Sequence, residues 1–241
     1  MDVTFIPKQP NYEHILRMHP PVLANRYLPD WYKNMERTIT RDDGLTGKTA
    51  KKCPAIQDTL TEGFIIPMWS KFEFASVKDE NGYIVNQNWN FFMVNAVTED
   101  IEKHLSSHTQ YQVEGMDINL TIDNRLLKMT LPYKIIVPEG YNIKYSDPFY
   151  HFRKDIRCLT GIVEADKWGH VTLPFELLQD NFTIEAGQPL VHGLIYKREE
   201  EPLNIITRNG TDEEYKKIYD EHFELFTNDK NYRTRKNKWK K

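Results

Sequence analysis

Short apolar runs rich in β-branched and aromatic residues alternate with turn residues through the middle of the chain. The runs recur roughly every 8–12 residues, a spacing typical of antiparallel sandwiches and barrels. We expect strands at 64–74, 89–97, 126–131, 133–137, 141–144, 158–163, 169–173 and 190–196. The pattern therefore predicts a mainly β protein with an antiparallel barrel, β-clip-like or jelly-roll-like core.

Proline and glycine refine these strands. Asn81-Gly82 is the preferred pair for a type I′ turn, so 78–82 should close a hairpin. Pro67 lacks the N–H that a central strand position needs, which implies an edge or a bulge there.

Helical spacing dominates only near the C-terminus. Thr211 is a good N-cap and Glu214 completes a capping box, so we expect a helix over 211–227. One face of this helix would carry Tyr215, Ile218, Tyr219, His222, Leu225 and Phe226. That face must pack on the protein's own sheet or on a partner subunit.

Two shorter segments are also candidates for helices. Pro54 suits a first helical position and Gly63 suits a stop, which predicts a short helix between them. Residues 98–108 should form a short helix or a loop.

The first 50 residues contain five prolines, which favour extended segments and turns. We interpret 1–50 as an irregular arm anchored at 28–35. There Trp31 and Tyr32 could bury a large area or contact a partner. The expected organisation is an arm at 1–50, a β-rich core at 51–205, a helix at 206–227 and a tail at 228–241.

Charge singles out the tail. Residues 228–241 hold seven Lys or Arg and one Asp, a net +6 in a chain of net charge −3, so the rest carries −9. Lys236 and Lys238 flank Trp239 in a pattern that fits an acidic protein groove or a nucleic-acid backbone. The acidic body would repel a polyanion, so we favour a protein partner or the chain's own body.

The cysteines, the N-terminus and the length of the apolar runs indicate the cellular compartment of the protein. Cys53 and Cys158 are too few for a disulfide framework and are typical of free thiols in a reducing compartment. The N-terminus lacks the pattern of a signal peptide, and the apolar runs are too short to span a bilayer. We expect a cytoplasmic protein with no membrane partner.

Common catalytic patterns are missing from the sequence. There is no glycine-rich phosphate loop and no Gly-x-Ser-x-Gly elbow. His104 and His108 would share a helix face, but no third ligand accompanies them. We therefore expect no metal, no cofactor and no assigned catalytic residue.

The densest polar cluster lies between 151 and 170. Arg153 and Arg157, with Glu164, Asp166 and His170, form a candidate anion-binding set. The alternative is a sheet surface laced with ion pairs that contribute little free energy.

Most of the chain resembles an uncharacterised protein family of large tailed bacteriophages, notably those of marine cyanobacteria. The resemblance rests on residues 28–35, 53–56, 67–69, 174–175, 186–190 and 196–199. It implies a protein of the host cytoplasm, with possible incorporation in the virion, and no particular activity.

A second, shorter resemblance concerns the fold. Residues 161–171 resemble the third motif of trimeric dUTP pyrophosphatases, and 186–196 resemble the strand that follows, which implies a β-clip-like core. The family's catalytic Asp aligns with Glu164 and its stacking Tyr with Lys167. Its Ser-Gly phosphate motif is missing, the nearest text being 146–148, and so is its glycine-rich C-terminal motif. We expect no dUTP hydrolysis.

These observations favour a non-enzymatic, oligomeric structural or interaction protein of a phage, such as a decoration or connector-region subunit of the virion. The alternative is an enzyme or sensor of dUTPase-like fold that binds a small anion or nucleotide. A nucleic-acid-associated factor that works through the basic tail is the third hypothesis.

Overall fold

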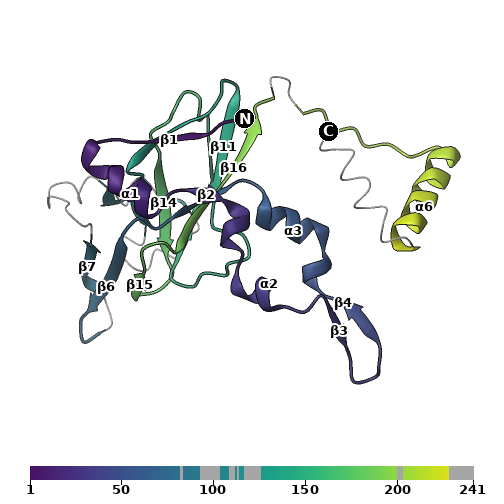
Figure 1. The fold of residues 1–241 in the computed structure, drawn as a ribbon, viewed down its shortest axis with the longest axis horizontal. Coiled ribbons are helices and arrows are strands. Elements are labelled where there is room, and N and C mark those ends of the chain that lie inside the picture. The colour runs from purple at the N-terminus through teal and green to yellow at the C-terminus, as the bar shows by residue number, and fades with distance from the viewer. Residues whose placement is uncertain are drawn as a thin grey trace. The chain divides into compact units, whose positions relative to one another are not determined.

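A computed structural model shows antiparallel β-sheets with short helices around them (Figure 1). The structure describes residues 1–81, 84–92, 104–108, 112, 114–116, 126–199 and 203–227. The chain divides into two units, Met1–Arg198 and Glu199–Lys241, which we call the body and the C-terminal unit. No helix of the described residues is both long and apolar enough to cross a membrane.

The largest described sheet of the body has five strands, and every neighbouring pair is antiparallel. In order across the sheet they are β13 (Gly161–Val163), β11 (Tyr141–Ser146), β16 (Pro189–Lys197), β5 (Phe64–Pro67) and β2 (Val22–Leu23). The register shifts opposite Pro67, between Pro189 and Val191. The irregularity expected from that proline is therefore present.

Four smaller sheets complete the described β-structure. One joins β12 (Ile156–Cys158), β14 (Thr172–Leu177), β9 (Leu126–Thr130) and β8 (Leu105–Ser107). Another joins β15 (Asn181–Ile184), β6 (Lys71–Lys78) and β7 (Ile84–Phe92). The two-stranded sheets pair β1 (Thr4–Pro7) with β10 (Tyr133–Ile136), and β3 (Thr38–Thr40) with β4 (Thr46–Lys48).

Short helices connect the strands of the first third of the chain. They are η1 (Pro10–Tyr12), α1 (Glu13–Met18), η2 (Ala24–Tyr27), α2 (Asp30–Asn34), η3 (Ala50–Lys52) and α3 (Pro54–Thr61). Pro54 opens α3, and Gly63 follows its C-terminus with φ +75°. The helix expected there is confirmed.

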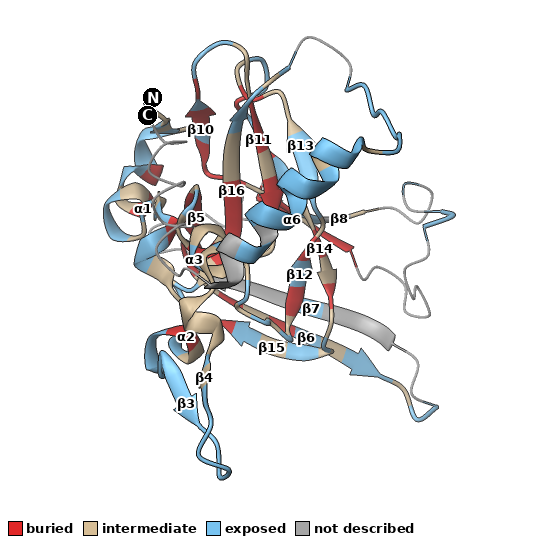
Figure 2. Ribbon diagram, turned by 90° about the vertical axis from the view of Figure 1, so that its right-hand side faces the viewer, coloured by how far each residue is buried: buried red, intermediate tan, exposed pale blue. Residues whose placement is uncertain are grey.

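The core lies between the sheets, where the buried positions concentrate (Figure 2). Strand β9 turns Leu127 and Met129 fully inward, and β14 does the same with Phe175. Because strand side chains alternate between faces, every second residue supplies this interior. One continuous apolar cluster results, which also includes Tyr12 and Ile15 from the N-terminal segment.

The mainly β, antiparallel prediction is confirmed, but the described sheets do not close into a barrel. Closure requires each strand to pair on both sides. In the two largest sheets the edge strands are only two or three residues long: β2, β8, β12 and β13. The expected strand at 158–163 is in fact β12 and β13, which belong to different sheets.

The irregular arm expected at 1–50 is wrong for most of its length. Strand β1 pairs with β10, β2 pairs with β5, and the boundary expected at residue 50 falls inside the body. Tyr12 and Ile15 are each 2% exposed, so their burial fixes the segment to the core. Within residues 1–50, the hairpin β3–β4 is the segment that is exposed over most of its length.

The structure describes only parts of the expected turn at 78–82, strand at 89–97 and helix or loop at 98–108. Residues 98–103 and Gly82 lie outside the described residues, as do 93–97 of the expected strand at 89–97. Within the described part, Leu105–Ser107 is strand β8, paired with β9, so no helix joins His104 to His108.

Helix α6 (Asp212–Thr227) is the long helix of the C-terminal unit. The Thr211 Oγ1 accepts the Glu214 N–H at 3.3 Å, and the Glu214 carboxylate accepts the Thr211 N–H at 2.8 Å. This reciprocal pair is the predicted capping box. The described chain places the domain boundary after Arg198, seven residues before the expected one.

Candidate functional site

Arg153 does not offer its guanidinium to an external anion. Its Nε and Nη2 donate to the two carboxylate oxygens of Asp155 at 2.9 and 2.7 Å, and its Nη1 donates to the Pro189 carbonyl at 2.8 Å. The side chain is 10% exposed. Because all three directions of the guanidinium fork are occupied, Arg153 joins the loop after β11 to the start of β16.

Arg157 has a similar internal partner. It lies on β12 directly opposite Glu176 of β14, and its Nε donates to that carboxylate at 2.9 Å. The pair is a cross-strand ion pair at a sheet surface, a type that contributes little free energy when solvent can reach it.

The acids of the predicted site belong to a different group. Arg198 donates to Asp166 at 2.8 Å and approaches Glu164 at 3.3 Å, while Gly140 N–H donates to Asp166 at 2.8 Å. The Arg198 guanidinium, assisted by that backbone donor, lowers the pKa of Asp166 to about 2. Lys167 completes the group through Glu164, at 2.6 Å.

The structure therefore divides the predicted anion-binding set. Arg153 and Arg157 pair with one set of carboxylates, Glu164 and Asp166 pair with Arg198, and His170 is exposed without a described contact to either group. Sequence reasoning missed Arg198 because it lies 32 residues from Asp166 in the chain. The described contacts assign these charges to holding loops and strands together.

His104, considered above as a metal ligand, and the Cys158 thiol are also buried. His104 is 4% exposed, and its Nδ1 lies 2.8 Å from the Thr130 carbonyl. Among the described residues, no three His, Cys, Asp or Glu side chains gather in a way that could hold a metal ion. Cys158 is buried, and burial together with nearby Asp147 raises its pKa to about 12, which suppresses thiolate chemistry there.

Three aromatic side chains form the most distinctive surface of the body. Trp31 of α2 packs against Tyr150 and Phe152 of the loop after β11, with ring centroids 6.4 and 6.0 Å apart. The Trp31 Nε1–H donates to the Tyr150 carbonyl at 2.7 Å. We call Trp31, Tyr150 and Phe152 the aromatic ledge. Phe152 is 69% exposed and Tyr150 is 36% exposed, so two rings of the ledge face solvent.

The backbone beneath the ledge is strained. Tyr150 has φ +60° and Phe152 has φ +49°, in the left-handed region that residues with a Cβ rarely adopt. Each such residue costs about 1–3 kcal/mol and persists only where its surroundings over-determine the conformation. Two strained residues in one loop therefore indicate that neighbouring contacts hold the loop in this conformation.

Contacts at both ends of the loop hold that shape. At its start, Asp147 Oδ1 accepts the Cys158 N–H at 2.6 Å, and the His151 N–H donates to the Pro148 carbonyl at 3.2 Å. At its end, the Arg153–Asp155 pair and the bond from Arg153 to Pro189 fix the loop to β16.

A buried histidine supports the loop from below. The Phe149 ring packs edge-on to His192, which is 1% exposed and whose Nε2 lies 2.6 Å from the Glu62 carbonyl. Burial lowers the pKa of His192, so the ring is neutral and Nε2 carries the proton that it donates to Glu62. The ledge thus rests on packed side chains and has a fixed base.

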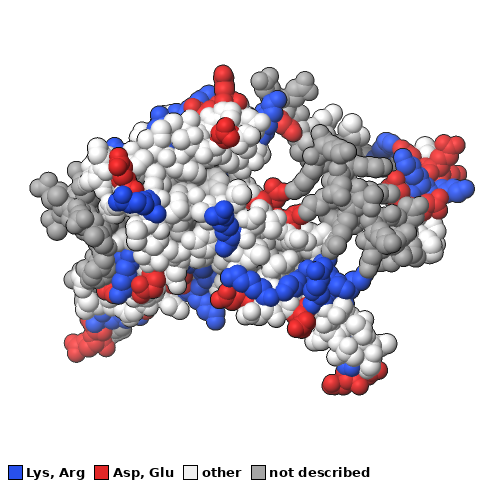
Figure 3. Space-filling view, in the orientation of Figure 1, with Lys and Arg blue, Asp and Glu red and all other residues white. Residues whose placement is uncertain are grey.

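Basic side chains gather on the same part of the body. Figure 3 shows Lys and Arg side chains over α2 and η3. Lys51 Nζ donates to the Lys33 carbonyl at 2.7 Å, which joins η3 to α2, and Lys33 pairs with Asp30 at 3.0 Å. The aromatic ledge therefore adjoins a partly neutralised basic surface.

The predicted partner-contact residues separate in the structure. Trp31 lies in the ledge, as a contact surface requires, whereas Tyr32 is 7% exposed and packs inside the body, so its assignment as a contact residue is wrong. Lys236, Lys238 and Trp239 lie outside the described residues. The sequence signal for Tyr150 and Phe152 was the aromatic run 149–152 after Pro148, which sequence reasoning did not use.

Comparison with known protein families and with curated proteins finds no match to this chain.

Proposed function

We propose that the chain is a non-enzymatic interaction protein that binds a partner protein through the aromatic ledge. The observation that carries the proposal is the pair of solvent-facing rings, Tyr150 and Phe152, held on a left-handed backbone by contacts at both ends of the loop. In its concrete form the chain is a virion component of a tailed bacteriophage, a decoration or connector-region subunit. The resemblance to a phage protein family supports that form.

Exposed aromatic rings on a fixed loop favour protein binding. Aromatic residues dominate the energetics of protein interfaces, and their affinity is greatest when the free protein already holds them in the bound geometry. The strain at Tyr150 and Phe152 is compensated in the free chain by the contacts of Arg153 and Asp147. A partner would therefore meet a surface that needs little reordering.

The charges favour binding over catalysis. Arg153 and Arg157, the cations that a small-anion enzyme or sensor would use, donate to Asp155 and Glu176. The acids Glu164 and Asp166 are paired with Arg198. The alternative function at this cluster would first require these pairs to break.

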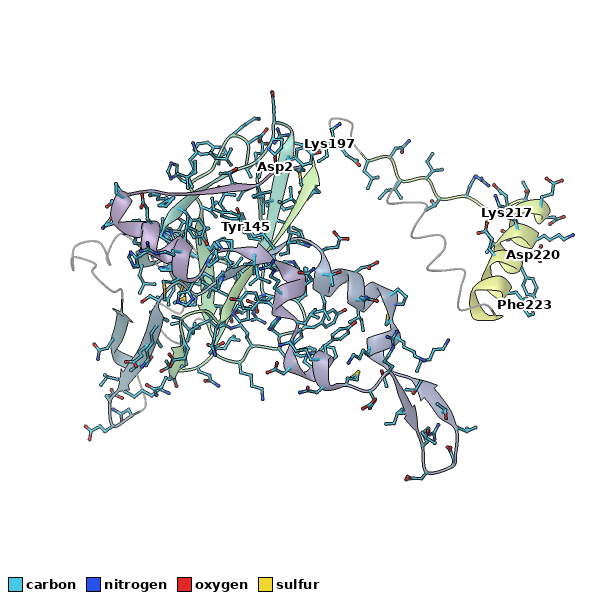
Figure 4. All side chains as sticks on the ribbon, viewed as in Figure 1. Asp2, Tyr145, Lys197, Lys217, Asp220 and Phe223 are labelled. Carbon is cyan, nitrogen blue, oxygen red and sulfur yellow. The ribbon has the colours of Figure 1, made fainter. Side chains whose placement is uncertain are left out.

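Helix α6 supports the same class of function from the C-terminal unit. Tyr215, Ile218, Tyr219 and Phe223 are 52–69% exposed, at the spacing of one helix face. Figure 4 shows Phe223 on this helix together with Lys217 and Asp220. A helix with this apolar face is suited to a second docking contact.

The test compares two aromatic residues of equal exposure. Phe152 lies in the ledge, whereas Trp168 takes part in none of the ring contacts that form the ledge. Each of the two side chains is 69% exposed. We would purify virions produced with wild-type chain, Phe152→Asp or Trp168→Asp, and measure the chain by mass spectrometry. We expect stoichiometric wild-type and Trp168→Asp protein and loss of Phe152→Asp.

Two results would contradict the proposal. Absence of the wild-type chain from virions would show that the chain is not a virion component. Equal incorporation of Phe152→Asp would show that the aromatic ledge is not the contact surface. Titration of the chain with single-stranded DNA, followed by Trp fluorescence, provides the third arm. Tight binding with a steep salt dependence that Phe152→Asp abolishes would favour a nucleic-acid partner instead.

A further inference from the structure

His151 lies between the two solvent-facing rings of the aromatic ledge but does not face solvent with them. Its neighbours Tyr150 and Phe152 have positive φ angles and are exposed, whereas His151 is half-buried. Its N–H donates to the Pro148 carbonyl at 3.2 Å, and its imidazole is held towards η2 by a hydrogen bond to the Tyr27 backbone. The outward rings and the inward imidazole thus belong to one conformation of the loop.

A second imidazole, that of His192 on β16, is buried beneath the same loop. Phe149 covers it, with ring centroids 4.6 Å apart, and the Glu62 carbonyl accepts its Nε2–H at 2.6 Å. Its Nδ1 is buried and has no hydrogen-bond partner in the described part of the chain. A charged imidazole donates from both nitrogens, so protonation of His192 would leave one N–H buried without an acceptor.

Cationic side chains surround the two imidazoles. Arg153 of the same loop and Lys33 of α2 act electrostatically on His151, and so does His192. The contact of Glu62 with His192 is through its carbonyl. Protonation of either ring would therefore add a positive charge beside existing ones.

The two carboxylates of the loop are engaged at its ends. Asp147 accepts the Cys158 N–H, and Asp155 pairs with Arg153. Burial raises the pKa of Asp147; it also acts to raise that of Asp155, but the Arg153 guanidinium outweighs it and lowers the pKa. Asp155 therefore keeps its charge in mild acid, and the anchor from Arg153 to β16 persists when an imidazole is protonated.

The surroundings of both imidazoles lower their pKa. Burial is the main cause for His151 and the cations beside it act in the same direction, although the hydrogen bond to the Tyr27 backbone opposes them. Burial also lowers the pKa of His192. A histidine released to solvent titrates near about 6.5, so the closed loop binds protons less readily than an opened one. The closed conformation therefore has its full stability above about pH 6.5 and loses it as the pH falls further.

The backbone strain makes the centre of the loop the part that opens. Tyr150 and Phe152 keep their left-handed conformation only while surrounding contacts over-determine it. The inward imidazole of His151 supplies one of those contacts, directly between the two strained residues. Once that imidazole moves to solvent, both residues are free to relax and their rings leave the positions that they hold in the ledge.

We propose that His151 and His192 form a pH switch that opens the centre of this loop in mild acid, displaces the rings of the aromatic ledge and releases the bound partner. Protonation of packed histidines at about pH 5–6 changes interfaces in this way in other pH-sensing proteins. The release step rests on the proposed function, whereas the opening of the loop does not.

Hydrogen exchange measured by mass spectrometry on the full chain reports the opening. Labelling at about pH 7.5 and about pH 5, with times scaled to the intrinsic exchange rate, gives protection factors for 147–157 and, as an internal reference, for β9. His151→Gln keeps a polar side chain that is neutral at both pH values. His170→Gln is its control, because His170 is an exposed histidine outside the loop.

We expect the loop of the wild type and of His170→Gln to lose protection at least about tenfold between the two pH values, while β9 retains its protection. The loss in His151→Gln should be less than about threefold. No loss in the wild type, an equal loss in all three chains, or a loss that β9 shares equally would overturn the proposal.

The ring signals of the wild-type chain give a second test, which holds even where a variant changes the loop. The chain has eight histidines, and an NMR titration follows each ring. The signal missing from His151→Gln should titrate below the ordinary value of about 6.5. A pKa at or above that value would overturn the switch.

Purified virions test the release step. Held at about pH 5, they should lose the wild-type and His170→Gln chains and retain His151→Gln, as measured by mass spectrometry of the pelleted particles. Equal retention of the three chains would overturn the release step. A wild-type chain that is absent from virions contradicts the proposed function instead, and the exchange and NMR results then decide the switch by themselves.

Discussion

At the residue scale, Gly63 sets the geometry of the junction between α3 and β5. Gly63 and Gly140 have nearly the same φ, +75° and +79°, but a Cβ at Gly63 meets Gly193 whereas one at Gly140 meets nothing. Gly140→Ala should cost about 1 kcal/mol from backbone strain alone, and Gly63→Ala about 3 kcal/mol or more. Urea unfolding of both variants measures the difference, and equal losses would show that the close approach to Gly193 is not a constraint.

Asp166 gives the body a specific pH dependence. Arg198 and the Gly140 N–H lower its pKa to about 2, below its ordinary value, so the folded state binds this proton less readily than the unfolded state. The stabilisation is complete above about pH 4 and is lost as the pH falls towards 2. We expect Asp166→Asn to lower the urea midpoint near pH 7, with a deficit that shrinks below pH 4.

An exposed aspartate provides the control for that experiment. Asp42 lies on the turn between β3 and β4. Asp42→Asn should follow the wild-type curve at every pH. A deficit for Asp166→Asn that stays constant down to pH 2 would mean that its carboxylate charge is not the source of the stability.

Residue partners were harder to predict than residue types. The sequence indicated that charges are dense between 151 and 170, and the structure places ion pairs there. Which charge meets which depends on strand register: Arg157 faces Glu176 because β12 lies antiparallel to β14, and Arg198 reaches Asp166 from the end of β16. Neither register follows from local spacing.

At the element scale, α6 tests the capping box directly. Thr211→Ala removes the oxygen that accepts the Glu214 N–H and should destabilise the helix by about 1 kcal/mol, whereas Thr211→Ser retains it. Hydrogen exchange at the amides of the first turn measures the effect. Equal exchange in the two variants would show that the Arg208–Glu214 ion pair alone holds this terminus.

Elements with local signals were predictable, and elements defined by distant partners were not. Helices α3 and α6 carry their own start signals, Pro54 and Thr211. Strands β9, β10, β11 and β16 follow apolar runs bounded by proline or glycine. By contrast, β1 is a strand because β10 lies beside it, and β8 because of β9. The sequence predicts an irregular arm over the first of these segments and a short helix or a loop over the second.

At the scale of the whole molecule, the buried core belongs to the body. Every described buried apolar residue lies between Tyr12 and Val191, so the described residues after Arg198 add nothing to that core. A chain ending at Arg198 should therefore retain the β-rich circular dichroism spectrum and unfold in one cooperative transition with the wild-type midpoint. A chain ending at Thr227 separates the contribution of the basic tail from that of α6. A midpoint lowered by more than about 4 °C, roughly 1 kcal/mol for a domain of this size, in the shorter chain alone would show that the segment 199–227 stabilises the body.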